Sequence, residues 1–450
     1  MAPIINTYNS EGVDRSALER TGRGGILSDG YLRSKPLAAY LEDGEEPVVL
    51  RSNAKRGVVR STVRSEEREQ IAPGDGYRAF ALATDTRLLI VVGDTDDDGD
   101  WSASVPLTDV EVVEHSDGVL TSEFVVTTAD DEQLYFPSRD DLAPMVEYLD
   151  AASLRWIAVE EHLDDAREAI MEADRLTRSR LYDEAMDAVR DAMGETDAAR
   201  RNERELSEDG VEAATTRIER VEARIEGARL RTLEGRAAHT IDLAEAHWRD
   251  GEYAQAHDAY GTAHDDYEEA LSANVGDPEV AERLRTKLDR VERNVAALEQ
   301  APVERAEAAH ERARETDDLR ERGEELAFAL DRYRTALELD WGRSERRFNG
   351  DPEAIRAAVD TVARELVETR RRYATQRVRR GDVHRDAGRH TQAEARYRDA
   401  YDALVDTVPV ARELVPETHD AVQDHCDAVE RRLRRLDTTD DQTPVPSGTS

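Results

Sequence analysis

Hydrophobic residues change their spacing along the chain near residue 140. Before that point they form short runs of valine, leucine and isoleucine separated by Gly, Asp and Ser, a pattern typical of strands joined by tight turns. After it, Ala and Leu recur every three or four residues among Glu and Arg, which is the spacing of one helix face. The pattern therefore predicts an α+β chain in two parts, a small antiparallel β domain followed by an all-α region.

The first part is predicted to hold about seven strands in roughly 90 residues, mostly at hairpin spacing. They lie at 48–50, 58–59, 77–83, 88–92, 105–113, 124–126 and 134–136. A short amphipathic helix over 32–41 precedes them. Leu142, Val146 and Leu149 share one helical face and predict a helix that closes the domain. Residues 1–26 have little apolar content and are interpreted as a flexible N-terminal arm, so that the β domain covers 27–150.

Three short motifs in this part resemble a known family. Residues 82–89 read Leu-Ala-Thr-Asp-Thr-Arg-Leu-Leu, residues 106–110 read Pro-Leu-Thr-Asp-Val, and Gly118 follows. Over about residues 40–150 the chain resembles bacterial pleckstrin-homology-like (PH-like) domains of the YokE-like or GRAM-like branch. The resemblance implies a β-barrel or sandwich with a C-terminal helix, and binding of lipid head groups or peptides. An unrelated small β-barrel is the alternative.

The same resemblance implies a site for an anionic head group between the first strands. Basic residues do cluster there in the sequence: Arg51, Lys55, Arg56, Arg60 and Arg64. Glu66, Glu67 and Glu69 follow at once and oppose that reading.

The second part is predicted to form long helical hairpins at 150–194, 208–274, 278–341 and 352–407, followed by a helix over 411–436 that bends or begins near Pro416. One pattern recurs around the expected turns, most clearly as Ala244, Gly251, Tyr253, Ala256, Tyr260 and Ala263. Related copies cover 173–192 and 381–400, and half a copy lies at 329–336. Glycine allows the chain to reverse, and alanines allow two helices to approach closely.

This pattern resembles the turn region of the tetratricopeptide repeat, but its copies lie roughly 64 to 73 residues apart. We therefore expect a tetratricopeptide-like hairpin array over 151–436, with a disordered tail at 437–450. By the resemblance, Glu245, Trp248, Asp382 and Arg385 would face a partner-binding groove. Packing in the core or at the hairpin seam is the alternative for Trp248, and for the whole set the alternative is that the lengthened hairpins form no groove.

Apolar residues near heptad spacing, including Val211, Ile218, Val221 and Ile225, mark 211–233 as a possible coiled coil. It would pack within its own hairpin or pair two chains. We favour packing within the chain, because a hairpin with a short turn supplies its own partner helix.

Composition changes this picture mainly through charge. Asp and Glu number 100 against 62 basic residues, a net charge of −38, and only Lys35, Lys55 and Lys287 are lysines. This resembles the haloarchaeal type of composition found in salt-in halophiles, where about 1 M salt shortens the Debye length to roughly 3 Å and screens the repulsion. Such a surface argues against nucleic-acid binding. The absence of a long apolar run and of an apolar signal segment predicts a cytoplasmic protein.

Few residue patterns point to chemistry. Asp94, Asp96 and Asp98 with Gly99 match the first half of a calcium loop, but the twelfth position is Val105 rather than Glu. An acidic hairpin turn explains them equally well. Phosphate-loop, dinucleotide and nucleophile-elbow motifs do not occur, and the single Cys426 excludes a cysteine zinc cage. We therefore expect no cofactor, no resident metal and no enzymatic activity.

The sequence thus predicts a halophilic interaction or scaffold protein that binds a protein partner of unknown identity. One alternative is a peripheral membrane adaptor that uses the basic cluster 51–64. Another is a homo-oligomeric coiled coil through 211–233. The oligomeric state is left open.

Overall fold

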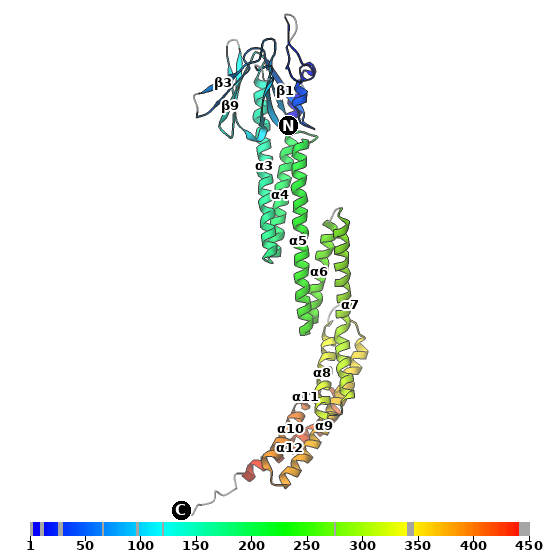
Figure 1. The fold of residues 1–450 in the computed structure, drawn as a ribbon. Coiled ribbons are helices and arrows are strands. Elements are labelled where there is room, and N and C mark those ends of the chain that lie inside the picture. The colour runs from blue at the N-terminus through cyan, green and yellow to red at the C-terminus, as the bar shows by residue number, and fades with distance from the viewer. Residues whose placement is uncertain are drawn as a thin grey trace, which may run out of the picture. The chain divides into compact units, whose positions relative to one another are not determined.

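The computed structural model describes residues 3–9, 13–25, 30–64, 67–95, 99–118, 121–273, 276–339 and 346–440 (Figure 1). The chain divides into two compact units. The first comprises Met1–Gly235 with Ala273–Val275, and the second comprises Arg236–Ser272 with Gly276–Ser450. The β domain and the first helical hairpin both belong to the first unit.

Two antiparallel sheets form the β domain. One has the order β1 (Pro47–Asn53), β4 (Ala79–Thr84), β5 (Arg87–Val92), β6 (Trp101–Pro106). The other has the order β3 (Arg68–Ile71), β2 (Val58–Thr62), β9 (Glu132–Ser138), β8 (Ser122–Thr128), β7 (Val110–Asp117). Residues of both sheets share one hydrophobic core with the first helix that follows them. The predicted fold class, a small antiparallel sandwich with a closing helix before an all-α region, is confirmed.

Both faces of the first sheet are buried. In β5, Leu88, Ile90 and Val92 enter the core between the sheets, whereas Leu89 and Val91 enter a second core on the outer face. The segments that cover this outer face contain α2 (Arg15–Glu19) and η1 (Leu37–Tyr40). An earlier helix, α1 (Ile4–Asn9), contributes a buried Ile5 to the core between the sheets.

The prediction of a flexible arm over residues 1–26 is therefore wrong for the part that the structure describes. Ile5 and Ala17 are buried, and the ring of Tyr8 packs edge-on against Tyr148 at 5.9 Å between centroids. The low apolar content misled the prediction, because a few contacts attach each short helix: Ile5 and the Tyr8 ring in α1, and Ala17 in α2.

One strand, β3, has no counterpart in the prediction. Its residues Arg68, Glu69 and Gln70 are exposed and only Ile71 is buried. It lies at the edge of its sheet and pairs with β2 alone. An edge strand with one buried side chain has no alternation of polar and apolar residues that a sequence pattern could show.

The helix that closes the β domain is also the first helix of the first hairpin. α3 runs without interruption over Ala143–Arg178 and is followed by α4 (Tyr182–Leu206). Its N-terminal part, including Tyr148 and Trp156, packs in the β-domain core. Its later residues pack against α4. The domain boundary expected at residue 150 therefore falls inside a continuous helix.

The remaining helices follow the order of the expected hairpins. They are α5 (Glu212–Asp250), α6 (Tyr253–Ala273), α7 (Pro278–Glu315), α8 (Leu319–Glu338), α9 (Pro352–Asp386), α10 (His390–Val405), α11 (Val408–Leu414) and α12 (Pro416–Asp440). The last two, α11 and α12, stand where one helix over 411–436 was expected, with a break before Pro416. Gly251 and Gly388 adopt positive φ angles of 84° and 71° at two hairpin turns, as the recurring motif suggested. Gly194 does not end a helix, since α4 continues through it, and α12 extends four residues beyond the expected 436. Residues 441–450 of the predicted tail lie outside the described residues.

The apolar stripe of 211–233 is used within the chain. Ile218, Val221 and Ile225 are buried in one cluster with residues of α3 and α4. The ion pair of Arg200 with Glu222, at 2.8 Å, flanks this seam. These residues of the stripe therefore pack inside the first unit, as we favoured.

Candidate functional site

The Thr-Asp-Thr-Arg motif at 84–87 forms the turn between β4 and β5 and has a structural role. The Oγ1 of Thr84 accepts hydrogen bonds from the backbone N–H groups of Thr86 and Arg87. The Arg87 guanidinium donates two hydrogen bonds to the carboxylate of Glu45, at 2.8 and 2.7 Å. The Glu45 side chain is 2% exposed. This bidentate pair attaches the segment before β1 to the hairpin.

Helix α3 is anchored on the same turn. The hydroxyl of Tyr148 donates to the Thr84 carbonyl at 2.7 Å, and the indole of Trp156 donates to the Asp85 carbonyl at 2.7 Å. The carboxylate of Asp85 accepts from the Glu46 N–H at 3.0 Å. Burial, and then the neighbouring Glu45 and Glu46, raise the pKa of Asp85 to about 6. Residues 84–87 therefore join the hairpin to the segment before β1 and to α3.

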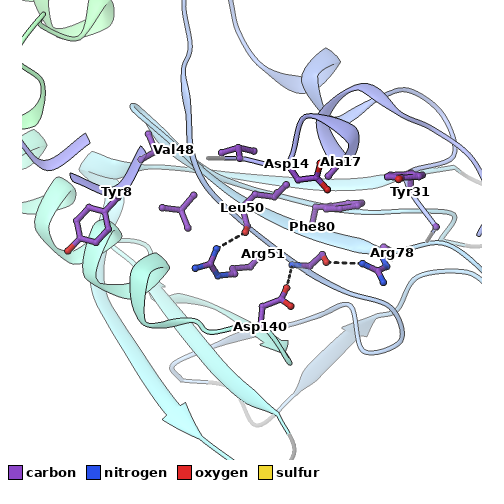
Figure 2. A pocket seen from close by; sticks show the side chains of 14 residues that line it. Tyr8, Asp14, Ala17, Tyr31, Val48, Leu50, Arg51, Arg78, Phe80 and Asp140 are labelled. Atoms are coloured by element: carbon purple, nitrogen blue, oxygen red, sulfur yellow. Dashed lines mark hydrogen bonds between the residues drawn. The ribbon is translucent and has the colours of Figure 1, made fainter. Parts of the chain in front are cut away.

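A concave site lies beside β1, between that strand and the N-terminal helices (Figure 2). We call it the β1 slot. It has a volume of about 270 Å³ and is lined by Tyr8, Val13, Asp14, Ala17, Gly30, Tyr31, Val48, Val49, Leu50, Arg51, Ser52, Arg78, Phe80 and Asp140. In this view Tyr8 and Tyr31 lie toward opposite ends, and Arg51, Arg78 and Asp140 line one side.

The polar groups of the slot are held by a short network around Ser52. Its backbone N–H donates to the Asp140 carboxylate at 3.2 Å, and its Oγ accepts from Arg78 at 3.3 Å. The Arg51 guanidinium donates to the Leu50 carbonyl at 2.9 Å and to the Asp141 carbonyl. The slot therefore presents two cations and one carboxylate in fixed positions.

The N-terminal helices add two further groups. Hydrogen bonds from the side chain and the backbone of Ser16 lower the pKa of Asp14, which caps α2 and is ionised at neutral pH. Burial, and then Glu147, raise the pKa of Tyr8, so its hydroxyl stays protonated. The slot thus combines charges of both signs with an apolar wall that includes Val48 and Phe80.

The edge of β1 is capped by side chains along this slot. The Leu50 carbonyl accepts from Arg51, the Ser52 N–H donates to Asp140, and the Ser52 carbonyl accepts from the Ser138 hydroxyl at 2.7 Å. Occupied edge groups disfavour the addition of another strand. The slot is therefore suited to side chains of a ligand rather than to an extra strand.

The predicted basic cluster is not assembled into one patch. Only Arg51 lines the slot. Arg56 donates to the Thr121 hydroxyl at 3.0 Å, Arg60 pairs with Glu132, and Arg64 pairs with Asp131 at 3.1 Å. Lys55 lies exposed in the turn between β1 and β2. Arg56, Arg60 and Arg64 therefore have separate partners within the domain, and the head-group pocket implied by the resemblance stays a prediction.

The predicted groove residues of the helices make contacts within the second unit. Trp248 packs edge-on against Tyr260, with 6.4 Å between ring centroids, and Glu245 is half-buried. Asp382 accepts a hydrogen bond from Tyr397 at 2.7 Å and pairs with Arg385 at 3.2 Å. Trp248, Asp382 and Arg385 therefore have partners within the second unit.

The acidic loop after β5 is held by its neighbours. Asp94 pairs with Arg33, and Asp100 accepts the backbone N–H groups of Arg33 and Ser34 at 3.0 and 2.7 Å. The other two candidate calcium ligands, Asp96 and Asp98, lie outside the described residues. Asp94 is thus engaged by a cation of the chain itself.

Among the described residues, two groups bring one histidine together with two carboxylates: His162 with Asp165 and Glu195, and His264 with Asp265 and Glu268. In the first, the Nδ1 of His162 lies 2.7 Å from a Glu195 oxygen, which is a direct hydrogen bond. Both groups consist of half-buried and exposed side chains. Close carboxylates are expected by chance in a chain with this many acidic residues.

Comparison with known proteins gives few matches. No protein-family description matches the chain. No curated protein matches it either. Among solved structures it is similar to one described as "Vps36 N-terminal PH domain", at 16% sequence identity, with 29% of this chain and 89% of that chain covered and a TM-score of 0.19.

Among the described residues, no helix is both long and apolar enough to cross a membrane. What the chain itself establishes is its architecture: an antiparallel β sandwich with a small slot beside β1, closed by a helix that continues into an array of helical hairpins.

Proposed function

We propose that this chain is a non-catalytic protein-binding protein, in which the β domain docks a partner at the β1 slot and the helical hairpins act as a scaffold. The β1 slot is the observation that carries the proposal. It holds fixed donors and acceptors of both charge signs beside an apolar wall, on a domain in which both faces of the first sheet are otherwise covered. Such mixed surfaces are typical of protein interfaces that form and dissociate.

We also propose that the β domain is a PH-like domain. Its two antiparallel sheets, its closing helix and the motif at 84–87 support a PH-like domain. The tetratricopeptide-like character of the hairpins rests on the glycine turns at 251 and 388. Both kinds of domain are commonly interaction modules, which is consistent with a partner protein.

The test is affinity capture from a lysate of the source organism at about 2 M KCl, where long-range charge attraction is screened. Three baits are compared: the natural chain, Arg78→Gln in the slot, and Arg64→Gln as a control. Arg64 is 86% exposed on the same domain and lies outside the slot.

We expect one protein to be captured by the natural chain and by the Arg64 variant, and to be lost or strongly reduced with the Arg78 variant. Equal capture by all three baits would remove the slot from the proposal. Capture of no protein by any bait would contradict the scaffold role itself.

A further inference from the structure

A second concave site lies in the other unit, where the first turns of α8 meet α9 and the last turns of α10. This cleft has a volume of about 270 Å³. Arg370 and Tyr373 of α9 line it, together with Gly323 of α8 and with Asp402 and Asp406 at the end of α10. All of these elements belong to the second unit, so the cleft is independent of the β1 slot.

The side chain of Arg370 lies across Gly323. A Cβ atom added at Gly323 would be 3.5 Å from the Cγ of Arg370 and 4.0 Å from its Nε. Burial lowers the pKa of Arg370. The negative charges of Asp406 and Glu324 act in the opposite direction but are smaller effects. No described residue forms a hydrogen bond or an ion pair with its guanidinium. A half-buried guanidinium without a partner is costly, and an acceptor supplied by a ligand would remove that cost.

Two carboxylates of the cleft likewise form no direct hydrogen bond or ion pair with a described residue. Asp402 and Asp406 are one helical turn apart, both are exposed, and no described residue pairs with either carboxylate. The other acidic side chains of the cleft have partners. Asp399 pairs with Arg396 at 3.2 Å, and Glu324 accepts from Arg320 at 3.0 Å.

The charges restrict what the cleft can bind. A simple anion on Arg370 would face the carboxylates of Asp402 and Asp406. A simple cation between those two carboxylates would face Arg370. A ligand that carries both charges satisfies all three groups, because a guanidinium binds a carboxylate in a bidentate manner and two carboxylates bind a cation. The volume suits a molecule smaller than most drug-sized ligands.

We infer that this cleft binds a small zwitterion of the basic amino-acid class. Its α-carboxylate would bind the Arg370 guanidinium, and its cationic side chain would lie between Asp402 and Asp406. This inference is separate from the proposed docking of a protein at the β domain, and neither requires the other.

The experiment is ligand-observed NMR with the full chain at about 2 M KCl, a concentration that screens non-specific attraction to the acidic surface. The probes are L-arginine, agmatine, which lacks the carboxylate, and acetate, which lacks the cation. We expect saturable binding of L-arginine, with agmatine and acetate at least about tenfold weaker. Equal binding of agmatine and L-arginine would overturn the inference, as would no saturable binding of L-arginine at about 10 mM.

Variants locate the binding. Arg370→Met and Asp402→Asn are each expected to weaken L-arginine binding at least about tenfold. Arg364→Gln is the matched control on α9, because Arg364 is 61% exposed and does not line the cleft. If Arg370→Met alters the melting temperature, the exposed Asp402→Asn still decides the question. Unchanged binding in Asp402→Asn, or an equal loss in Arg364→Gln, would overturn the assignment.

Discussion

The indole nitrogen of Trp156 donates a hydrogen bond of 2.7 Å to the backbone carbonyl of Asp85, which joins a helix to the tip of a β-hairpin 71 positions earlier. Tyr148 makes the same kind of bond to the preceding carbonyl, that of Thr84. Two consecutive carbonyls in a buried turn are thus satisfied by two aromatic side chains of α3. These two hydrogen bonds attach the N-terminal half of α3 to the β domain.

Tyr148→Phe should destabilise the chain by about 1–2 kcal/mol, because the Thr84 carbonyl loses its donor while the aromatic ring is retained. Tyr148 is fully buried, so water does not replace the lost bond readily. Denaturant unfolding at high salt measures the change. Tyr135→Phe is the control, since the hydroxyl of Tyr135 donates to Gln133 in its own strand, bonds to no other described residue and should matter little. An equal effect of both substitutions would contradict the role of the Tyr148 hydroxyl.

Asp85→Asn should stabilise the chain at neutral pH. The pKa of Asp85 is raised from 3.8 to about 6 by burial, so the folded state binds a proton more tightly than the unfolded state. The wild type therefore loses stability as the pH rises from about 4 to 6, whereas the asparagine variant does not. The difference should reach up to about 3 kcal/mol above pH 6 and vanish below pH 4.

Melting curves of the two proteins between pH 4 and 8 give this difference directly. Asparagine can still accept the hydrogen bond from the Glu46 N–H, so that contact is kept in the variant. A gain in stability that does not depend on pH, or a loss at pH 7, would show that the Asp85 carboxylate is not the cause.

Glu45 and Arg87 should be energetically coupled. Their bidentate contact is buried, with side-chain exposures of 2% and 13%. Glu45→Leu leaves the guanidinium without its main partner and should cost about 3 kcal/mol or more. The double variant with Arg87→Met should cost at least about 1 kcal/mol less than the sum of the single variants. Strict additivity in the double-mutant cycle would contradict a direct pair.

Gly323→Ala should stabilise the second unit by about 1 kcal/mol, because Gly323 lies inside α8 and the new Cβ would make an ordinary contact with Arg370 at 3.5 Å. Gly388→Ala is a control for which we expect a change in stability of the opposite sign. Gly388 has open space around it but a φ angle of 71°, so alanine there should destabilise by about 1 kcal/mol. Thermal unfolding of the two variants should therefore shift in opposite directions.

Much of the fold could be predicted from the sequence, because long apolar patterns report local structure directly. The turns near Gly251 and Gly388 are examples, since a single residue type meets a backbone requirement there. The uninterrupted apolar run from Leu88 to Val92 also carried a signal that the prediction did not use. A strand with no polar alternation is buried on both faces, which required a cover such as the N-terminal segments provide.

The candidate sites could not be predicted in the same way. Arg51 and Tyr8 meet at the β1 slot only because α1 folds back on the domain, and no local pattern encodes that return. Arg370 and Gly323 are 47 positions apart, on different helices. Arg60 and Arg64 lie in a basic stretch of the sequence, but the fold brings the carboxylates of Glu132 and Asp131 to them. Ion pairs with residues distant in sequence decide which charges remain available.

The continuity of α3 has a consequence for how the first unit can act. Its 36 residues give a length of about 54 Å, and no linker interrupts it between the β domain and α4. The β domain therefore cannot swivel about a joint relative to the first hairpin. Consider a partner that contacts both the β domain and the first hairpin. Its second contact would cost no orientational entropy of this chain, because folding has already fixed the two parts relative to each other.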